Sequence, residues 1–373
     1  MKRFTTILPL LLSIGLIGCS SDSDNTQTST PGTVNFQPGQ VGISITQINE
    51  PSLLYPELEE PYGRPLLHNG IFYLTSYDNN AILGFTGIPK TNNPTPAFIL
   101  KGDQTLRPNS IESNSSQFFI ESSYQGGDIL VYNTAPTSNA TLEPDFVLGG
   151  PGCSASALSN TTDISVTEDY LLSADRQNAR IMIWNLPITE NNQPADLVLG
   201  QSDFTHCTEN DDDQNDTKDA TPSARTLDNP TSVWSDGTRI IAADSDNSRV
   251  LIWNTFPTAN FAPADLVLGQ NNFINDAPND VNQDGLTDTN PDLSVFKQNY
   301  EYIHSNGTQI CLGDSGNNRI LIWNQFPTQN MQPASMALTE SETLFDDASL
   351  CSFVGDKLII GDYGNARWVI LGN

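Results

Sequence analysis

One hexapeptide pattern occurs three times in this chain and constrains its fold more than any other feature. The copies are Arg180-Ile-Met-Ile-Trp-Asn185, Arg249-Val-Leu-Ile-Trp-Asn254 and Arg319-Ile-Leu-Ile-Trp-Asn324. Their tryptophans are 69 and 70 residues apart, and two copies continue into the same heptapeptide, Ala-Asp-Leu-Val-Leu-Gly-Gln, at 195–201 and 264–270. Self-similarity at a fixed period predicts an array of one supersecondary unit.

The middle copy predicts four antiparallel strands. Thr231–Ser235 and Arg239–Ala243 are apolar runs separated by Asp236-Gly237, a pair typical of a tight hairpin turn. Arg249–Asn254 is rich in β-branched and aromatic residues, and Asp265–Gly269 supplies a fourth strand. A four-stranded meander of about 44 residues has the size of a β-propeller blade.

Weaker copies of this unit fill the rest of the chain. The last copy stops at Asn373, one strand short, and a missing strand would leave an open sheet edge. The alternating segment Val41-x-Ile43-x-Ile45 is the obvious donor of that strand. We therefore predict an all-β fold, a six-bladed β-propeller of four-stranded antiparallel blades whose sixth blade is closed by an N-terminal strand. The expected blades are about 62–102, 107–150, 157–201, 224–270, 293–340, and 344–373 together with 41–48.

Four units carry the triplet Asp-x-x-Asn-x-Arg in front of an apolar third strand. This pattern resembles the NHL-repeat family of β-propellers, over roughly residues 62–371. Ser76 and Ala81 replace the Asp and the Arg in the first unit, and Ser123 and Asp128 replace them in the second. One pair in each blade favours a stabilising role, because an Arg five residues after a turn Asp can pair with it across the hairpin. The triplets are Asp175, Asn178 and Arg180; Asp244, Asn247 and Arg249; Asp314, Asn317 and Arg319; and Asp362, Asn365 and Arg367.

Residues 1–19 predict a targeting segment. A basic start precedes an apolar stretch that is too short to span a bilayer. Leu16-Ile-Gly-Cys19 then resembles the lipobox of bacterial lipoproteins, which implies a mature N-terminus at a lipidated Cys19. An ordinary secretory signal with an incidental cysteine is the alternative. Ser20 after the cysteine favours anchoring in the outer membrane. Residues 20–40 have the composition of a flexible tether, and we expect residues 41–373 to form the propeller.

The charge of the chain limits its partners. It has 16 basic and 44 acidic residues, a formal net charge of −28. Such a surface repels nucleic acid and anionic membranes and attracts divalent cations. We expect no nucleic-acid partner, membrane contact through the lipid anchor only, and a monomer that faces the periplasm or the cell surface. The expected partner is an unidentified protein or glycan of the cell envelope.

Four cysteines remain after Cys19, and in an oxidising compartment they can pair in three ways. Cys153 and Cys207 lie in the connectors into blades 3 and 4, which share one face of the ring, so a Cys153–Cys207 disulfide is the first expectation. Cys311 and Cys351 either form a Cys311–Cys351 disulfide between blades 5 and 6 or remain buried thiols.

The connector between blades 4 and 5 contains the segment D-x-N-x-D-G-x-x-D. It resembles the calcium loops of EF-hands, dockerins and thrombospondin type 3 repeats, in which oxygens at positions 1, 3 and 5 converge on the cation. Pro291 holds the position of the bidentate Glu of an EF-hand, and no flanking helices are evident, so we expect an isolated loop with structural calcium. The implied ligands are Asp280, Asn282, Asp284, the carbonyl of Leu286, and Asp288.

A related segment occupies the connector between blades 3 and 4. The two segments align on the downstream residues Pro222 and Pro291. Asp216 replaces Gly285 and would need a positive φ, which Asp tolerates better than most residues. A solvated acidic loop without metal is the alternative for both segments. The implied ligands are Asp211, Asp213, Asn215, the carbonyl of Thr217, and Asp219.

No catalytic constellation is recognisable in the sequence. His68, His206 and His304 fall in different registers of the repeat, and neither a nucleophilic serine with a matched base nor a phosphate loop is evident. We therefore favour a binding or scaffold protein and name no catalytic residue. The alternative is a lactonase-like hydrolase or lyase that uses an axial pocket, and convergent carboxylates with a histidine at the axis would favour it.

Overall fold

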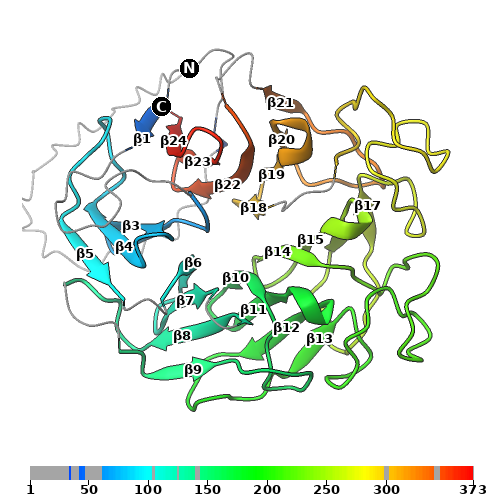
Figure 1. Ribbon diagram of the computed structural model, residues 1–373, viewed down its shortest axis with the longest axis horizontal. Helices are drawn as coiled ribbons and strands as arrows, with labels where there is room; N and C mark the ends of the chain where they lie inside the picture. Colours follow the sequence, from blue (N-terminus) through cyan, green and yellow to red (C-terminus); the bar gives the residue numbers. More distant parts are fainter. Residues whose placement is uncertain are drawn as a thin grey trace, which may run out of the picture. The chain divides into compact units, whose positions relative to one another are not determined.

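The computed structural model describes residues 33–34, 42–46, 61–102, 106–123, 126–138, 143–297, 302–339 and 345–372. Within these residues, six four-stranded antiparallel sheets follow one another around a ring, and the first strand of each lies nearest the centre (Figure 1). The predicted all-β, six-bladed propeller with four-stranded blades is thereby confirmed.

Blades 1 to 3 each consist of four consecutive strands. Blade 1 contains β2 (Leu66–His68), β3 (Ile71–Ser76), β4 (Ala81–Thr86) and β5 (Phe98–Lys101). Blade 2 contains β6 (Pro108–Ser113), β7 (Phe118–Ser122), β8 (Asp128–Tyr132) and β9 (Phe146–Leu148). Blade 3 contains β10 (Thr161–Val166), β11 (Tyr170–Asp175), β12 (Arg180–Asn185) and β13 (Leu197–Leu199), with the 3-10 turn η2 (Arg176–Asn178) after β11.

Blades 4 and 5 repeat this order, whereas blade 6 draws on both ends of the propeller sequence. Blade 4 contains β14 (Pro230–Ser235), β15 (Ile240–Asp244), η3 (Ser245–Asn247), β16 (Arg249–Trp253) and β17 (Leu266–Leu268). Blade 5 contains β18 (Ile303–Ser305), β19 (Ile310–Asp314), η4 (Ser315–Asn317), β20 (Arg319–Trp323) and β21 (Met336–Thr339). Blade 6 contains β22 (Ala348–Val354), β23 (Lys357–Asp362) and β24 (Arg367–Leu371), and β1 (Ile43–Ile45) pairs with β24 as its outer strand (Figure 1).

The hydrophobic core is divided among the contacts between blades. Six buried apolar clusters each combine side chains of neighbouring blades. Trp184, Trp253 and Trp323 are 1–2% exposed, and each packs in the cluster shared with the preceding blade. Each indole nitrogen donates to a backbone carbonyl of the loop that follows, at 2.9 to 3.0 Å. The repeated tryptophans are therefore packing elements between blades.

The Asp-Asn-Arg triplet forms a hydrogen-bonded unit in four blades, and its ion pair is buried in blades 3 to 5 and partly exposed in blade 6. In blade 4, Asp244 Oδ2 accepts bonds from Arg249 Nε at 2.7 Å and from Asn247 Nδ2 at 2.8 Å. Its other oxygen accepts the backbone N–H of Asp228, which belongs to the connector entering the blade, at 2.7 Å. The Nε–Oδ2 distance is 2.7 Å in blades 3 and 4, 2.6 Å in blade 5 and 2.5 Å in blade 6.

The guanidinium of the triplet also holds the connectors on both sides of its blade. Arg249 donates to the carbonyl of Phe273 in the following connector, at 2.6 Å. It donates to the carbonyls of Ser223 and Thr226 in the preceding connector, at 2.9 and 3.0 Å. Arg180 makes the matching contacts in blade 3. The triplet is thus a structural unit that fastens successive blades together.

Blades 1 and 2 lack the triplet, and one sequence alignment needs correction. In blade 1, Ser76 faces Ala81 across the hairpin, as the repeat predicts. In blade 2, Ser122 faces Asp128, so the prediction that Ser123 takes the place of the Asp is wrong. The error arose because the turn of blade 2 is one residue longer than the turns of the other blades.

We expect Arg249→Leu to lower the free energy of unfolding by about 3–5 kcal/mol, because it leaves the buried Asp244 carboxylate without its cation. The exposed ion pair of Arg225 with Asp212 offers a control, and Arg225→Leu should cost no more than about 1 kcal/mol. Urea unfolding followed by tryptophan fluorescence measures both. Equal losses in the two variants would contradict the structural role of the triplet.

Candidate functional site

An arginine from blade 1 occupies the centre of the ring. Arg64 precedes β2 and is 3% exposed. Its guanidinium donates five hydrogen bonds, of 2.5 to 3.2 Å, to residues of the first strands of four other blades. The acceptors are Glu112 Oε1, Asp163 Oδ2 and the carbonyl oxygens of Ile164, Val233 and Ile303. One side chain therefore joins blades 1 to 5 at the axis.

Asp163 organises the polar groups around this arginine. Its Oδ1 accepts the hydroxyl of Ser110 at 2.8 Å, and its Oδ2 accepts the hydroxyl of Ser232 at 2.5 Å. Ser232 Oγ in turn accepts the backbone N–H of Ile303 at 3.1 Å. We refer to Arg64, Glu112, Asp163, Ser110 and Ser232 as the hub cluster. Its members come from blades 1 to 4, and a hydrogen bond links it to blade 5.

A glycine allows the arginine to reach the axis. Gly63 has φ of +87°, and a Cβ at this position would lie 1.0 Å from the carbonyl oxygen of Asn109 in blade 2. Any other residue would push the segment away from blade 2. Sequence reasoning missed the cluster because it compared the turns and the third strands of the blades. Comparing the first strands would have aligned Ser110, Asp163 and Ser232 at one position.

Burial changes the pKa values of the ionisable groups around Arg64. Burial raises the pKa of Glu112 from 4.5 to about 7; the nearby Asp163 adds to the rise, and Arg64 offsets part of it. Burial also raises the pKa of Asp163, against the pull of Arg64. His304 accepts the backbone N–H of Phe353 at Nδ1, at 3.0 Å, and burial holds its pKa well below 6.5. The histidine is therefore neutral at pH 7.

A polar pocket of about 270 Å³ lies at one end of the axis. We call it the axial pocket. It opens on the connector face, the side of the ring that carries the connectors between blades and the turns between second and third strands. Tyr302, whose hydroxyl contacts the carbonyl of Thr162 at 3.3 Å and Asn109 Oδ1 at 3.5 Å, belongs to its wall. The lining residues are Tyr62, Tyr77, Asn109, Ser123, Asn160, Thr162, Arg176 and Tyr302.

The loop that begins at Asp280 is folded around its first carboxylate. Asp280 is fully buried and accepts the backbone N–H of Asp284 at 3.0 Å and of Gly285 at 2.7 Å. Asp288 accepts the N–H of Val281 at 3.0 Å, and Asn282 accepts that of Asp284 at 3.0 Å. The Leu286 side chain is 70% exposed. The predicted ligands thus share one tight loop.

The loop that begins at Asp211 has the same hydrogen-bond pattern. Asp211 accepts the N–H of Asn215 at 3.0 Å and of Asp216 at 2.8 Å, and Asp219 accepts that of Asp212 at 2.8 Å. Asp216 has φ of +62° where Gly285 has +86°, the conformation that the alignment requires. The two connectors are therefore equivalent in structure as well as in sequence.

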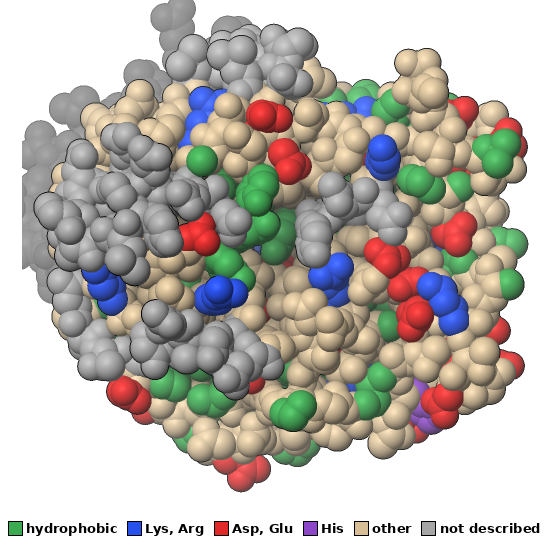
Figure 2. Space-filling view, in the orientation of Figure 1, with side chains coloured by type: hydrophobic (Ala, Val, Ile, Leu, Met, Phe, Trp, Pro, Cys, Tyr) green, Lys and Arg blue, Asp and Glu red, His purple; other side chains and the backbone are tan. Residues whose placement is uncertain are grey.

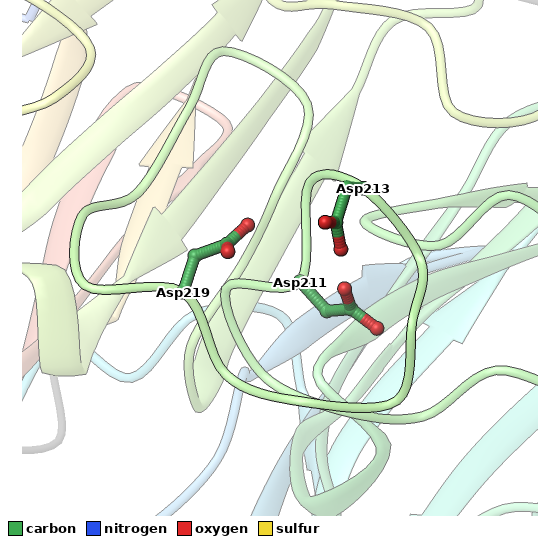
Figure 3. A group of neighbouring side chains, drawn as sticks. All are labelled: Asp211, Asp213 and Asp219. Atoms are coloured by element: carbon green, nitrogen blue, oxygen red, sulfur yellow. The ribbon is translucent and has the colours of Figure 1, made fainter.

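Three carboxylates converge in this second loop. Asp211, Asp213 and Asp219 have carboxylate oxygens within 4.8 Å of one another, and Figure 3 shows them turned toward a common space. A carboxylate that accepts two N–H bonds keeps further lone pairs, so Asp211 retains the capacity to bind a cation. The donor set of carboxylate oxygens, with the amide oxygen of Asn215 and the carbonyl of Thr217 nearby in the chain, fits a hard cation such as calcium.

Two disulfides cross-link neighbouring blades. Cys153 is joined to Cys207, with Cα atoms 6.3 Å apart, and this bond ties the connectors that enter blades 3 and 4. Cys311 is joined to Cys351, with Cα atoms 6.2 Å apart, and it links β19 of blade 5 to β22 of blade 6. The first bond joins the two connectors, and the second is one of the two alternatives left open for Cys311 and Cys351.

Residues 1–19, for which the sequence predicts a targeting signal that ends at Cys19, lie outside the described residues. None of the described residues belongs to a helix with the length and hydrophobicity needed to cross a membrane. Figure 2 shows acidic side chains spread over the visible face, several of them beside lysine or arginine side chains.

Comparison with known proteins finds similarity to solved structures only, at low sequence identity. No family model matches it, and no curated protein matches it. It is similar to the solved WD40 β-propeller domain of Doa1, at 12% identity and a TM-score of 0.45, over 82% of this chain and 77% of that one. It is also similar to a chain of a mitotic checkpoint complex, at 10% identity and a TM-score of 0.48, over 96% and 99%.

The raised pKa of Glu112 predicts a pH-dependent stability. A carboxyl that titrates at about 7 when folded and 4.5 when unfolded stabilises the fold fully below pH 4.5, and the contribution is lost as the pH rises through 7. Relative to Glu112→Gln, the wild type should therefore lose roughly 3 kcal/mol of unfolding free energy over this range. Urea titrations at several pH values measure the difference. Parallel curves for the two proteins would contradict it.

Proposed function

We propose that this chain is a lipid-anchored binding module of the bacterial cell envelope, with structural calcium in two connector loops and its partner on the connector face. The propeller fold suggests a binding or scaffold role, because blades hold many loops rigidly on one side of a ring. The axial pocket opens among those loops, and its wall combines tyrosines, amides and an arginine. A protein or a glycan of the envelope is the expected class of partner.

The hub cluster is the observation that carries this proposal. Asp163 is fully buried, and both its oxygens are engaged by hydroxyl groups and by Arg64. The charges at the axis therefore hold blades together and leave the floor of the axial pocket without an exposed carboxylate among the described lining residues. A recess of this kind suits recognition better than acid–base chemistry.

Calcium has a structural role in this proposal. In the loop that begins at Asp211, crowded carboxylates repel one another, and a bound cation would remove that repulsion. Asn210 and Asn247 exchange amide hydrogen bonds of 2.8 and 2.9 Å, so an ordered loop is coupled to the turn of blade 4. Asn279 and Asn317 make the same pair in blade 5. Ordering these loops would fix one side of the connector face.

The proposed lipid anchor is supported by the sequence of the first forty residues, and the proposed compartment is supported by that sequence and by the disulfides. The lipobox-like segment that ends at Cys19 supports a lipid anchor, and Ser20 supports the outer membrane. Two disulfides support an oxidising compartment such as the periplasm or the cell surface. The part of the expected 20–40 tether that precedes Val34 would let the propeller reach partners away from the membrane, because Val34 itself is buried and bonded to Gln309.

A second candidate, a hydrolase or lyase acting at the axis, is favoured by one observation. Glu112 has a pKa of about 7 and lies beside Arg64. The neutral His304 is on the first strand of blade 5, next to Ile303, whose carbonyl also accepts a hydrogen bond from Arg64. A carboxyl of that pKa can accept and return a proton near neutral pH. Loss of a measured hydrolytic activity in Glu112→Gln, with the fold intact, would favour this candidate.

Millimolar calcium should raise the melting temperature by roughly 2 °C, since a cation at about tenfold its Kd adds roughly 1.4 kcal/mol of stability. Asp213→Asn and Asp284→Asn should each reduce the rise, because they remove a ligand charge. Asp356→Asn, on an exposed turn of blade 6, is the matched control. Melting curves with calcium and with chelator measure the shift. An identical curve in both conditions would argue against structural calcium.

Partner capture tests the binding role of the connector face. Ser123→Trp should fill the axial pocket, while Asp356→Lys changes the charge of the opposite side of the ring. A cross-linked envelope partner should be lost from Ser123→Trp and retained by Asp356→Lys. Retention by both variants, with a normal melting temperature, would show that the partner does not use this pocket.

A further inference from the structure

One position of the repeat supplies much of the wall of the axial pocket. It is the residue that follows the second strand of each blade and begins the turn to the third strand, on the connector face. Three of its six copies, from blades 1, 2 and 3, line the pocket. The six residues are Tyr77, Ser123, Arg176, Ser245, Ser315 and Tyr363. Variation at this position therefore decides the chemistry of the wall.

The wall differs from blade to blade. Tyr77 lines the pocket in blade 1, and Tyr363 of blade 6 packs against Tyr62, another lining residue, with ring centroids 5.4 Å apart. Arg176 lines the pocket in blade 3. The equivalent serines of blades 4 and 5 are 3% and 8% exposed and stand outside the described lining. The wall is therefore aromatic beside blades 6 and 1 and cationic at blade 3.

A ligand can reach the wall of the pocket but not its floor. The floor residues Asn109, Thr162 and Tyr302 are 5–8% exposed and hydrogen-bonded to one another. The five other lining residues are partly exposed: Tyr62, Tyr77, Ser123, Asn160 and Arg176. The pocket is closed at its inner end, and its volume of about 270 Å³ is small for a ligand pocket. It therefore suits the end of a ligand better than the middle of a long chain.

The only charged residue in the described lining is a cation. Arg176 stands there without an Asp or Glu, in a chain with 44 acidic and 16 basic residues. A guanidinium has five N–H groups, so Arg176 can bind a ligand in addition to its contacts within the protein. The nearby Asp163 is paired with Arg64 beneath the floor. The pocket thus favours an anionic group on a surface that otherwise repels anions.

The aromatic rings of the wall are already covered by other side chains. The guanidinium of Arg107 lies over the Tyr77 ring, 5.6 Å from its centroid. The ring of Tyr62 lies between Tyr77 and Tyr363, with an edge contact of 5.5 Å to Tyr77. Stacking of a flat sugar face on these rings is therefore disfavoured, and polar contacts must carry the recognition.

We propose that the axial pocket binds the C-terminal carboxylate of a peptide, in an ion pair with Arg176. A guanidinium offers two parallel N–H groups that match the two oxygens of a carboxylate. The hydroxyl of Ser123 and the amide of Asn160 are polar groups for the last peptide unit. Capture of a chain end by its carboxylate is an established mode of peptide recognition. This inference rests on the proposed function, because it names the group by which a protein partner would enter the pocket.

A single carboxylate fits the charge of the site better than a phosphate does. A phosphate group carries about two negative charges at neutral pH, whereas a carboxylate carries one. The wall supplies one cation, and the whole chain has a formal net charge of −28. A dianion would therefore meet twice the long-range repulsion for the same ion pair.

Binding of short peptides with and without a terminal charge tests this proposal. The probes are four N-acetyl dipeptides that end in alanine, leucine, phenylalanine or serine, each compared with its C-terminal amide. Saturation-transfer NMR titrations measure their binding to the wild type, Arg176→Gln and Arg225→Gln. Arg225 is exposed and lies outside the pocket lining, so Arg225→Gln makes the same change of net charge elsewhere. Melting temperatures check the folding of each variant.

At least one dipeptide acid should bind the wild type and Arg225→Gln, and its amide should bind about tenfold more weakly or not at all. Arg176→Gln should weaken binding of the acid by a similar factor. Three results overturn the proposal: binding of no acid, equal binding of acids and amides, or equal affinities in Arg176→Gln and Arg225→Gln. Tighter binding of glucuronate or inorganic phosphate than of every dipeptide acid also overturns it, in favour of an acidic sugar or a phosphate.

Ser123→Trp provides a second variant, in case Arg176→Gln does not fold. It should abolish binding of the dipeptide acid, and unchanged binding overturns the proposal. The same variant separates this inference from the proposed function. Loss of the cross-linked envelope partner from Ser123→Trp, without binding of any dipeptide acid to the wild type, overturns the terminal carboxylate alone. Retention of that partner by Ser123→Trp instead removes the pocket from the proposed function.

Discussion

The buried ion pair between the second and third strands is the interaction on which this ring depends. In each of four blades the turn Asp accepts the Arg Nε, the Asn amide and a backbone N–H of the incoming connector. Because Asp244 and Arg249 are fully buried, their charges are stabilised only while all these bonds are formed. Each pair therefore couples the folding of a blade to the placement of the connectors on either side.

The hub shows how such a ring can be closed at its centre without symmetry. Blades of equal size would place equivalent groups around the axis, yet here Arg64 stands in blade 1 and Asp163 in blade 3. Several carbonyl oxygens of the inner strands need donors. The two terminal nitrogens of one guanidinium serve three of these carbonyls and two carboxylates, with one N–H shared between two acceptors. The charged groups at the axis are thereby committed to stability, which leaves recognition to the rims of the ring.

Departures from the repeat are where this chain acquires its candidate sites. The connectors into blades 4 and 5 carry extra acidic loops. Packing between blades tolerates such changes, because they lie at the faces of the ring and leave the apolar clusters intact. A repeat protein can thus add binding chemistry at one boundary while its neighbours keep the original contact.

Sequence alone determined the local content of this protein: the blade, the number of blades, and the equivalence of the Asp211 and Asp280 loops. These follow from spacing within about seventy residues, where strand period and turn chemistry act. Only the tertiary structure revealed the hub cluster, because Arg64 and Asp163 are 99 residues apart and meet through ring closure. It alone revealed the axial pocket, because the volume of a pocket depends on how the side chains of several blades pack around it. Local patterns encode the unit, whereas contacts between units depend on the geometry of the assembled ring.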